Sequence, residues 1–187
     1  MKLPNMTNRI CGIAFLFLLS PFIAAAQCEI FKSEMGDVQQ QMEQVHKLTD
    51  SLTTYAEASA FGATYTAAKE DARQAMILTG LALGAAYDAA DIAAEAQYQS
   101  ELCGLDLVMS HAIDAQNFAI HTRDQMEEAY ELAKRAYRAR KLGDINYLMR
   151  KSLTAAQEAE GFSQKAVYAA ADSHQSCNHS DVSLGGN

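Results

Sequence analysis

Small side chains recur at alternating steps of four and three residues along the middle of the chain. Over residues 68–100, all ten positions of this pattern hold Ala, Thr or Ser. A spacing of 3.5 residues is typical of the seam of a helix packed in coiled-coil fashion, and small seam residues let two helix backbones approach closely. The seam positions are Ala68, Ala72, Ala75, Thr79, Ala82, Ala86, Ala89, Ala93, Ala96 and Ser100.

Three other segments carry a stripe with the same spacing. They occupy residues 31–59, 105–136 and 145–169, and they mix Ala with larger apolar side chains such as Phe31 and Leu148. Each stripe predicts an amphipathic helix. The chain after residue 26 contains no Pro and is rich in Ala, Glu, Gln and Lys, which favours helix throughout.

Glycines mark the breaks between the stripes. The stripe shifts by two residues at Gly62 and again at Gly104, a rotation of about 200° around a helix, which excludes one continuous helix. At the third break, Gly143 suits a left-handed C-cap and Asp144 suits the next N-cap. The sequence therefore predicts four helices, at about residues 29–60, 65–101, 105–141 and 145–172.

Short connections between long helices force neighbours to run antiparallel. We therefore expect an all-α fold, an antiparallel up-down-up-down four-helix bundle over residues 27–172. Residues 173–187 are polar and end in Gly-Gly-Asn, which predicts a flexible tail. Residues 75–87 are apolar on all faces, so this run should be the most buried part of the bundle. It is too short for a stable membrane span, but it could receive a second copy or open onto a membrane.

The first 26 residues have the features of a signal peptide. A basic region precedes the largely apolar residues 10–23, and three alanines at 24–26 offer the small residues that signal peptidase reads before Gln27. The apolar stretch is shorter than the roughly 20 residues of a membrane span. We expect an exported chain that begins near Gln27 and is periplasmic or secreted. A retained anchor and acylation of Cys28 are the alternatives.

Charge is acidic overall but unevenly distributed. Removal of Lys2 and Arg9 with the signal peptide leaves 13 Lys and Arg against 23 Asp and Glu, a net charge of −10, which argues against nucleic-acid binding. Basic residues nevertheless gather around the turn between the third and fourth helices. This basic pole could dock a protein or contact an anionic surface, or it is a solvated helix end favoured by the macrodipole. It comprises Lys134, Arg135, Arg138, Arg140, Lys141, Arg150 and Lys151.

Three cysteines follow the signal peptide. In an up-down-up-down bundle, Cys28, Cys103 and Cys177 lie at the same end, and an oxidising compartment favours a disulfide between two of them. Both Cys28–Cys103 and Cys103–Cys177 remain open. Alternatively, His174, Cys177 and His179 form an H-x-x-C-x-H cluster whose ligand types suit Zn or Cu.

Other combinations of polar residues give weaker indications of a functional site. Glu43 and His46 form one E-x-x-H unit of the kind that di-iron bundles use twice, but no second copy exists, and we expect a solvent-facing pair. Neither a nucleophile motif nor a phosphate-binding loop is present. The sequence therefore predicts a non-enzymatic exported bundle without a cofactor, acting through contacts with a protein partner or with itself, as an assembly, adaptor or sensor-type module. A metal-binding or metal-sensing bundle and a membrane-active bundle are the alternatives.

Overall fold

The computed structural model describes residues 7–103 and 106–184, with side chains described over 28–102 and 106–177. Within these residues the chain forms four helices and no strand, as the sequence predicts. The helices are α1 (Thr7–Ala60), α2 (Tyr65–Cys103), α3 (Asp106–Arg138) and α4 (Leu142–Leu184).

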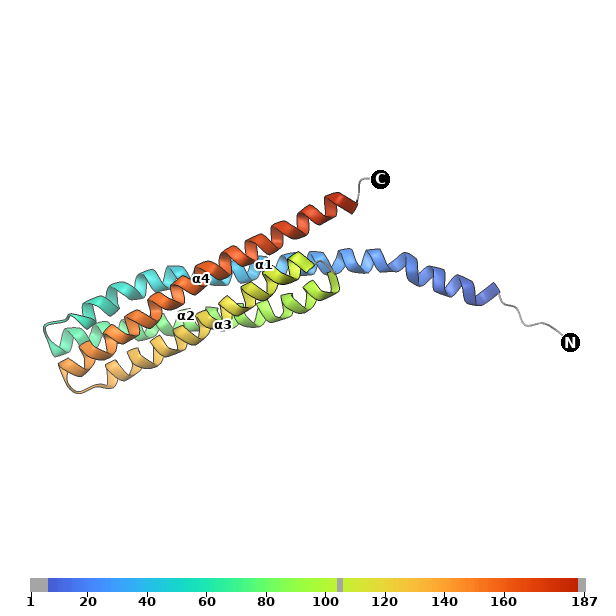
Figure 1. Ribbon diagram of the computed structural model, residues 1–187. Helices are drawn as coiled ribbons and strands as arrows, with labels where there is room; N and C mark the ends of the chain where they lie inside the picture. Colours follow the sequence, from blue (N-terminus) through green and yellow to red (C-terminus); the bar gives the residue numbers. More distant parts are fainter. Residues whose placement is uncertain (1–6, 104–105, 185–187) are drawn as a thin grey trace.

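The four helices lie alongside one another in an arrangement consistent with a four-helix bundle (Figure 1). Helix α1 packs against α2 and α4, and α3 packs against the same two helices. The α1–α2 and α3–α4 turns lie together at one end, which we term the turn end. The last residues of α2 and the first residues of α3 lie at the opposite end, termed the open end, beyond which α1 and α4 extend (Figure 1).

The predicted seams form the core. All ten small positions of the α2 seam are buried, which confirms this pattern. The predicted stripe of α1 is also buried at every position, namely Phe31, Met35, Val38, Met42, Val45, Thr49, Leu52, Ala56 and Ser59. The core has two apolar clusters, one toward each end, and the boundary on α1 falls between Met42 and Val45. Its largest fully buried side chains include Phe31, Met126 and Met149.

Buried hydroxyl groups show how closely the helices approach. The Ser59 hydroxyl donates to the Ala68 carbonyl at 2.7 Å, and the Ser152 hydroxyl donates to the Ala129 carbonyl at 2.8 Å, in both cases across a helix pair. The Thr49 hydroxyl instead donates to the Val45 carbonyl of its own helix at 2.8 Å. These bonds satisfy polar groups that would otherwise be costly to bury.

The turns differ from prediction in detail. Helix α4 begins at Leu142, and the Ile145 amide donates to the Lys141 carbonyl at 3.2 Å, so Lys141 rather than Asp144 stands at the helix boundary. Asp144 lies in the first turn, where its charge complements the helix dipole. Gly143 does not adopt the expected left-handed φ, and neither does Gly62.

Helix α4 extends beyond the predicted helix end at residue 172 and continues to Leu184. Ser173 and Cys177 are buried and extend the stripe that passes through Ala166 and Ala170. Small polar side chains can occupy a tightly packed seam, and the Ser173 hydroxyl donates to the Val108 carbonyl at 3.3 Å. The polar composition therefore does not end the helix here.

The apolar run of α2 is also less buried than expected. Its outward face leaves Ile77 and Leu81 42% and 56% exposed, and Gly84 is exposed beside them. Among the described residues, the segment Tyr65–Leu102 is the one that has the length and composition to cross a membrane, a test that a core helix also passes.

The predicted signal peptide stays a prediction. Helix α1 runs without a break past the expected cleavage point at Gln27. Residues 1–6 and the side chains of 7–27 lie outside the described part of the chain.

Candidate functional site

The basic residues of the predicted pole gather at the turn end. Arg135 and Arg138 lie in the last turn of α3, Arg140 and Lys141 follow in the turn, and the first turns of α4 add two more. An open groove of about 450 Å³ separates the two helices here. It is lined by Arg135, Arg138, Ala139, Asp144, Tyr147 and Leu148.

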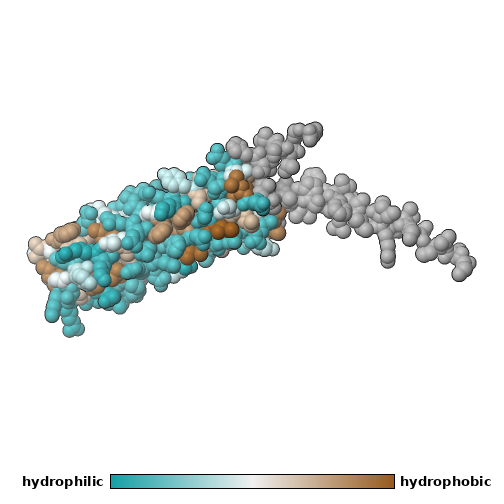
Figure 2. Space-filling model, viewed as in Figure 1, coloured by the Kyte–Doolittle hydropathy of each residue, from teal (hydrophilic) through white to brown (hydrophobic). Residues whose placement is uncertain are grey.

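Exposed aromatic rings lie among these cations. Arg150 Cζ lies 5.7 Å from the centroid of Phe61, and Lys151 Nζ lies 5.4 Å from that of Tyr147. Phe61 is 72% exposed and Tyr147 is 57% exposed. Apolar and polar atoms are interspersed over this end on the face shown in Figure 2. Cation–π contacts of this kind contribute roughly 0.5–1 kcal/mol each at exposed sites.

A second set of pairs extends this surface onto α2. Lys69 Nζ lies 5.2 Å from the ring centroid of Tyr65 and 5.6 Å from that of Tyr137. It also donates to the Tyr65 hydroxyl at 2.9 Å. We define the turn pole as the seven predicted basic residues together with Lys69, Phe61, Tyr65, Tyr137 and Tyr147.

Hydrogen bonds between the two turns hold the turn pole in place. Asn146 Nδ2 donates to the Gly62 carbonyl at 3.2 Å, and the Tyr65 hydroxyl donates to the Ala139 carbonyl at 3.1 Å. Gly62 is closely packed, since an added Cβ would lie 3.0 Å from Ala68 Cβ. The aromatic side chains therefore project from a fixed backbone.

Positively charged side chains become sparse away from the turn pole. At its α2 edge, Arg73 donates to both carboxylate oxygens of Glu70 at 2.7–3.1 Å, and these bonds, with one from Gln74, lower the pKa of Glu70 to about 2. The sequence between Arg73 and Arg123 contains no Lys or Arg. The open half is correspondingly acidic.

One carboxyl group of the acidic half is perturbed. Burial of Glu34 raises the pKa of its carboxyl group, with smaller contributions from the charges of Glu95 and Asp37. One of its oxygens is buried without a hydrogen-bond partner among the described residues. Burial, and to a lesser extent the neighbouring negative charges, therefore disfavours the ionised form of Glu34.

The structure describes the side chains of some of the predicted cysteine and histidine residues. Cys28 and Cys177 are buried in the apolar cluster nearer the open end, and Cys103 is the last residue of α2. The described side chains contain no disulfide. Both predicted pairings involve Cys103, whose side chain lies outside the described part, so they stay predictions. In the predicted metal cluster, His174 is exposed and Cys177 is buried, whereas the side chain of His179 also lies outside that part.

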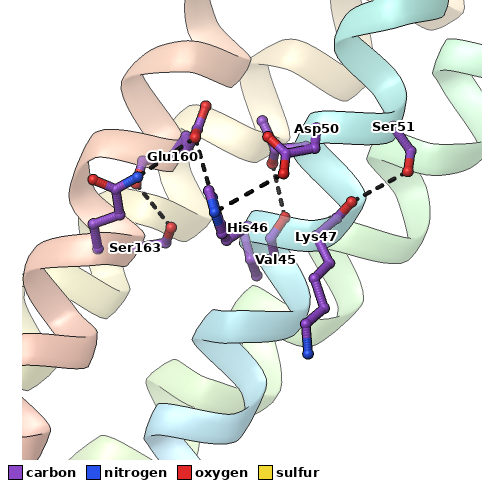
Figure 3. A network of polar contacts seen from close by, with 9 residues as sticks. Val45, His46, Lys47, Asp50, Ser51, Glu160 and Ser163 are labelled. Carbon is purple, nitrogen blue, oxygen red and sulfur yellow. Dashed lines mark hydrogen bonds and ion pairs between the residues drawn. The ribbon is translucent and has the colours of Figure 1, made fainter.

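A cluster that the sequence did not indicate lies between α1 and α4 (Figure 3). His46 Nδ1 lies 3.1 Å from Glu160 Oε1, and His46 Nε2 lies 3.9 Å from Asp50 Oδ2. A groove of about 280 Å³ adjoins the cluster and is lined in part by Glu43 and Ser163. His46 is thus not a simple solvent-facing partner of Glu43, because it contacts a carboxylate on another helix.

No protein-family model matches the chain, and no curated protein is significantly similar to it.

Proposed function

We propose that the protein is exported after removal of residues 1–26, folds as an up-down-up-down bundle, and acts without catalysis by docking an acidic protein surface on the turn pole. The export step rests on the N-terminal sequence pattern. The docking step rests on one observation, namely that exposed aromatic rings contact cations beside an open groove.

The chemistry of the turn pole favours a protein partner. Tyr and Arg are enriched among residues that carry binding energy in protein interfaces, where the ring supplies contact area and the guanidinium pairs with carboxylates. The backbone beneath is tied by the Asn146 and Tyr65 hydrogen bonds, so little ordering cost arises on binding. The acidic half of a second copy is one surface with the required charge.

Site-specific photocrosslinking in the producing cell tests this proposal. A crosslinking amino acid at Tyr147 should yield a discrete protein adduct. The matched control is Tyr168, which lies on the same helix toward the open end, is 70% exposed, and should yield none. Replacing Arg135 and Arg138 by Glu should abolish the adduct at position 147.

Several outcomes would contradict it. Equal adducts at 147 and 168, no adduct, or an adduct to lipid alone would each refute docking of a protein on the turn pole. An adduct with twice the mass of the chain would identify a second copy as the partner. The export step fails if the protein recovered from outside the cytoplasm does not begin near Gln27.

A membrane-active bundle is the second candidate, favoured by the exposed Ile77 and Leu81 on α2. It predicts that the protein releases dye from anionic liposomes and that replacing both residues by Gln abolishes the release. Failure of the wild-type protein to bind these liposomes would eliminate it.

A further inference from the structure

We propose that His46, Asp50 and Glu160 bind one divalent transition-metal cation of the Zn²⁺ type, at a site that ties α1 to α4. Each residue offers one ligand atom, and these atoms all lie within 4.8 Å of one another. The proposal is independent of the docking function of the turn pole.

The donor set suits such a cation. One imidazole nitrogen and two carboxylate oxygens are ligands that Zn²⁺ and its neighbours accept, whereas Ca²⁺ and Mg²⁺ prefer oxygen alone. Asp50 follows His46 by one helical turn on α1, so the two side chains lie on one face. Glu160 approaches from α4 (Figure 3).

The His46–Glu160 distance is compatible with shared ligation of one cation. Two ligand atoms at about 2.1 Å from one cation are separated by about 3.0–3.4 Å for angles between square and tetrahedral, and the observed separation is 3.1 Å. In spite of this distance, buried Nδ1 is not aligned to donate a hydrogen bond to any described group.

Groups around the cluster can orient the ligands and complete the coordination. Gln164 Nε2 lies 3.5 Å from Glu160 Oε1 on the same helix. Gln39 Nε2 donates to Glu43 Oε1 at 3.0 Å, which holds that carboxylate at the edge of the adjoining groove. The groove reaches the cluster at His46, and zinc sites with three protein ligands take water at the open position.

The position of the site gives the cation a structural consequence. On α1 the boundary between the two apolar clusters falls between Met42 and Val45, directly before His46. On α4 the same boundary falls between Ala159 and Ala166, around Glu160. A bound cation would join the first and last helices where the apolar core is interrupted.

Calorimetric titration of the purified protein with Zn²⁺ at neutral pH tests the proposal. We expect one binding event that is weakened at least tenfold by His46→Gln and by Glu160→Gln, and less by Asp50→Asn. Excess Zn²⁺ should raise the thermal midpoint of the wild-type protein by about 5 °C or more, and this shift should vanish in His46→Gln. His174→Gln, which alters the other predicted metal cluster, is the matched control and should retain both effects.

A second readout separates loss of the site from loss of the fold. Helical circular dichroism of the variants without metal should equal that of the wild type, because His46 and Asp50 are partly exposed. Co²⁺ should give a visible absorption spectrum in the wild type that the Glu160→Gln variant lacks. Absence of Zn²⁺ uptake by the wild type, or uptake that His174→Gln removes and His46→Gln preserves, would overturn the proposal.

Discussion

The two ends of the bundle place a phenylalanine in opposite environments. Toward the open end, Phe31 is completely buried among the alanines of the neighbouring helices, whereas Phe61 at the turn end is 72% exposed beneath Arg150. Near Phe31 the surrounding charge is acidic, and near Phe61 it is basic. Phe31 therefore fills the core, whereas Phe61 presents its ring to solvent beside a turn whose backbone is held by the Asn146 and Tyr65 hydrogen bonds.

The largest effect should come from the matched pair of phenylalanines. Phe31→Ala should lower the free energy of unfolding by about 3–5 kcal/mol, because it leaves a cavity in a packed core. Phe61→Ala should change it by no more than about 1 kcal/mol, the value of its cation–π contact. Urea denaturation of both variants measures the difference, and equal losses would refute the contrast between the ends.

Two glycines at the turn end offer a sharper test of close packing. Gly62→Ala should lower the free energy of unfolding by about 1–3 kcal/mol, because the new methyl group meets Ala68 Cβ at 3.0 Å and the Ala58 carbonyl oxygen at 3.1 Å. Gly143→Ala meets open space in the first turn of α4 and should instead stabilise the protein by about 0.5–1 kcal/mol. Thermal denaturation compares them. A neutral Gly62→Ala variant would show that the turn is not tightly packed.

The smallest effect concerns the acidic half. Burial raises the pKa of Glu34 in the folded state. The folded state therefore binds this proton more tightly than the unfolded state does. As the pH rises, ionisation of Glu34 destabilises the fold. Glu34→Gln should therefore stabilise the protein at pH 7, by less than about 1 kcal/mol because solvent screens the group. The gain should disappear as the pH falls below the ordinary value of 4.5.

The control for this prediction is Glu57→Gln, an exposed site on the same helix near the turn end. It should produce no comparable gain at either pH. Urea denaturation at pH 7 and pH 4 distinguishes the variants, and a gain for Glu34→Gln that persists at pH 4 would rule out ionisation as its cause.

Helical periodicity predicts which residues are buried wherever only one of two neighbouring positions is small or apolar. On α4 the stripe over residues 145–169 predicts Phe162, and not its neighbour Ser163, as a seam residue. The structure buries Ser163 and leaves Phe162 at the edge, 5.1 Å from the ring of His121. Closely spaced helices have room for a hydroxyl group where a ring does not fit. Polar residues such as Ser173 can therefore continue a buried stripe, although their composition predicts the end of the helix.

The candidate sites were less predictable than the core. The location of Arg135 and Arg138 at one end follows from the positions of the turns, but no periodicity tells whether Phe61 points inward or outward. The contact of His46 with Glu160 depends on how α1 and α4 are set against each other, and that alignment is not encoded in the pattern of either helix. Polar clusters between distant helices therefore emerge only in three dimensions.

Because the seam side chains are short, most of them do little to fix the position of one helix along its neighbour. Most seam groups on α2 and α3 are single methyls, so a helix displaced along its neighbour by seven residues would meet nearly the same profile. A few bulky groups, among them Phe31, Met126 and Met149, break this translational equivalence. Resistance to shear must then be concentrated at these few positions instead of being spread along the interface.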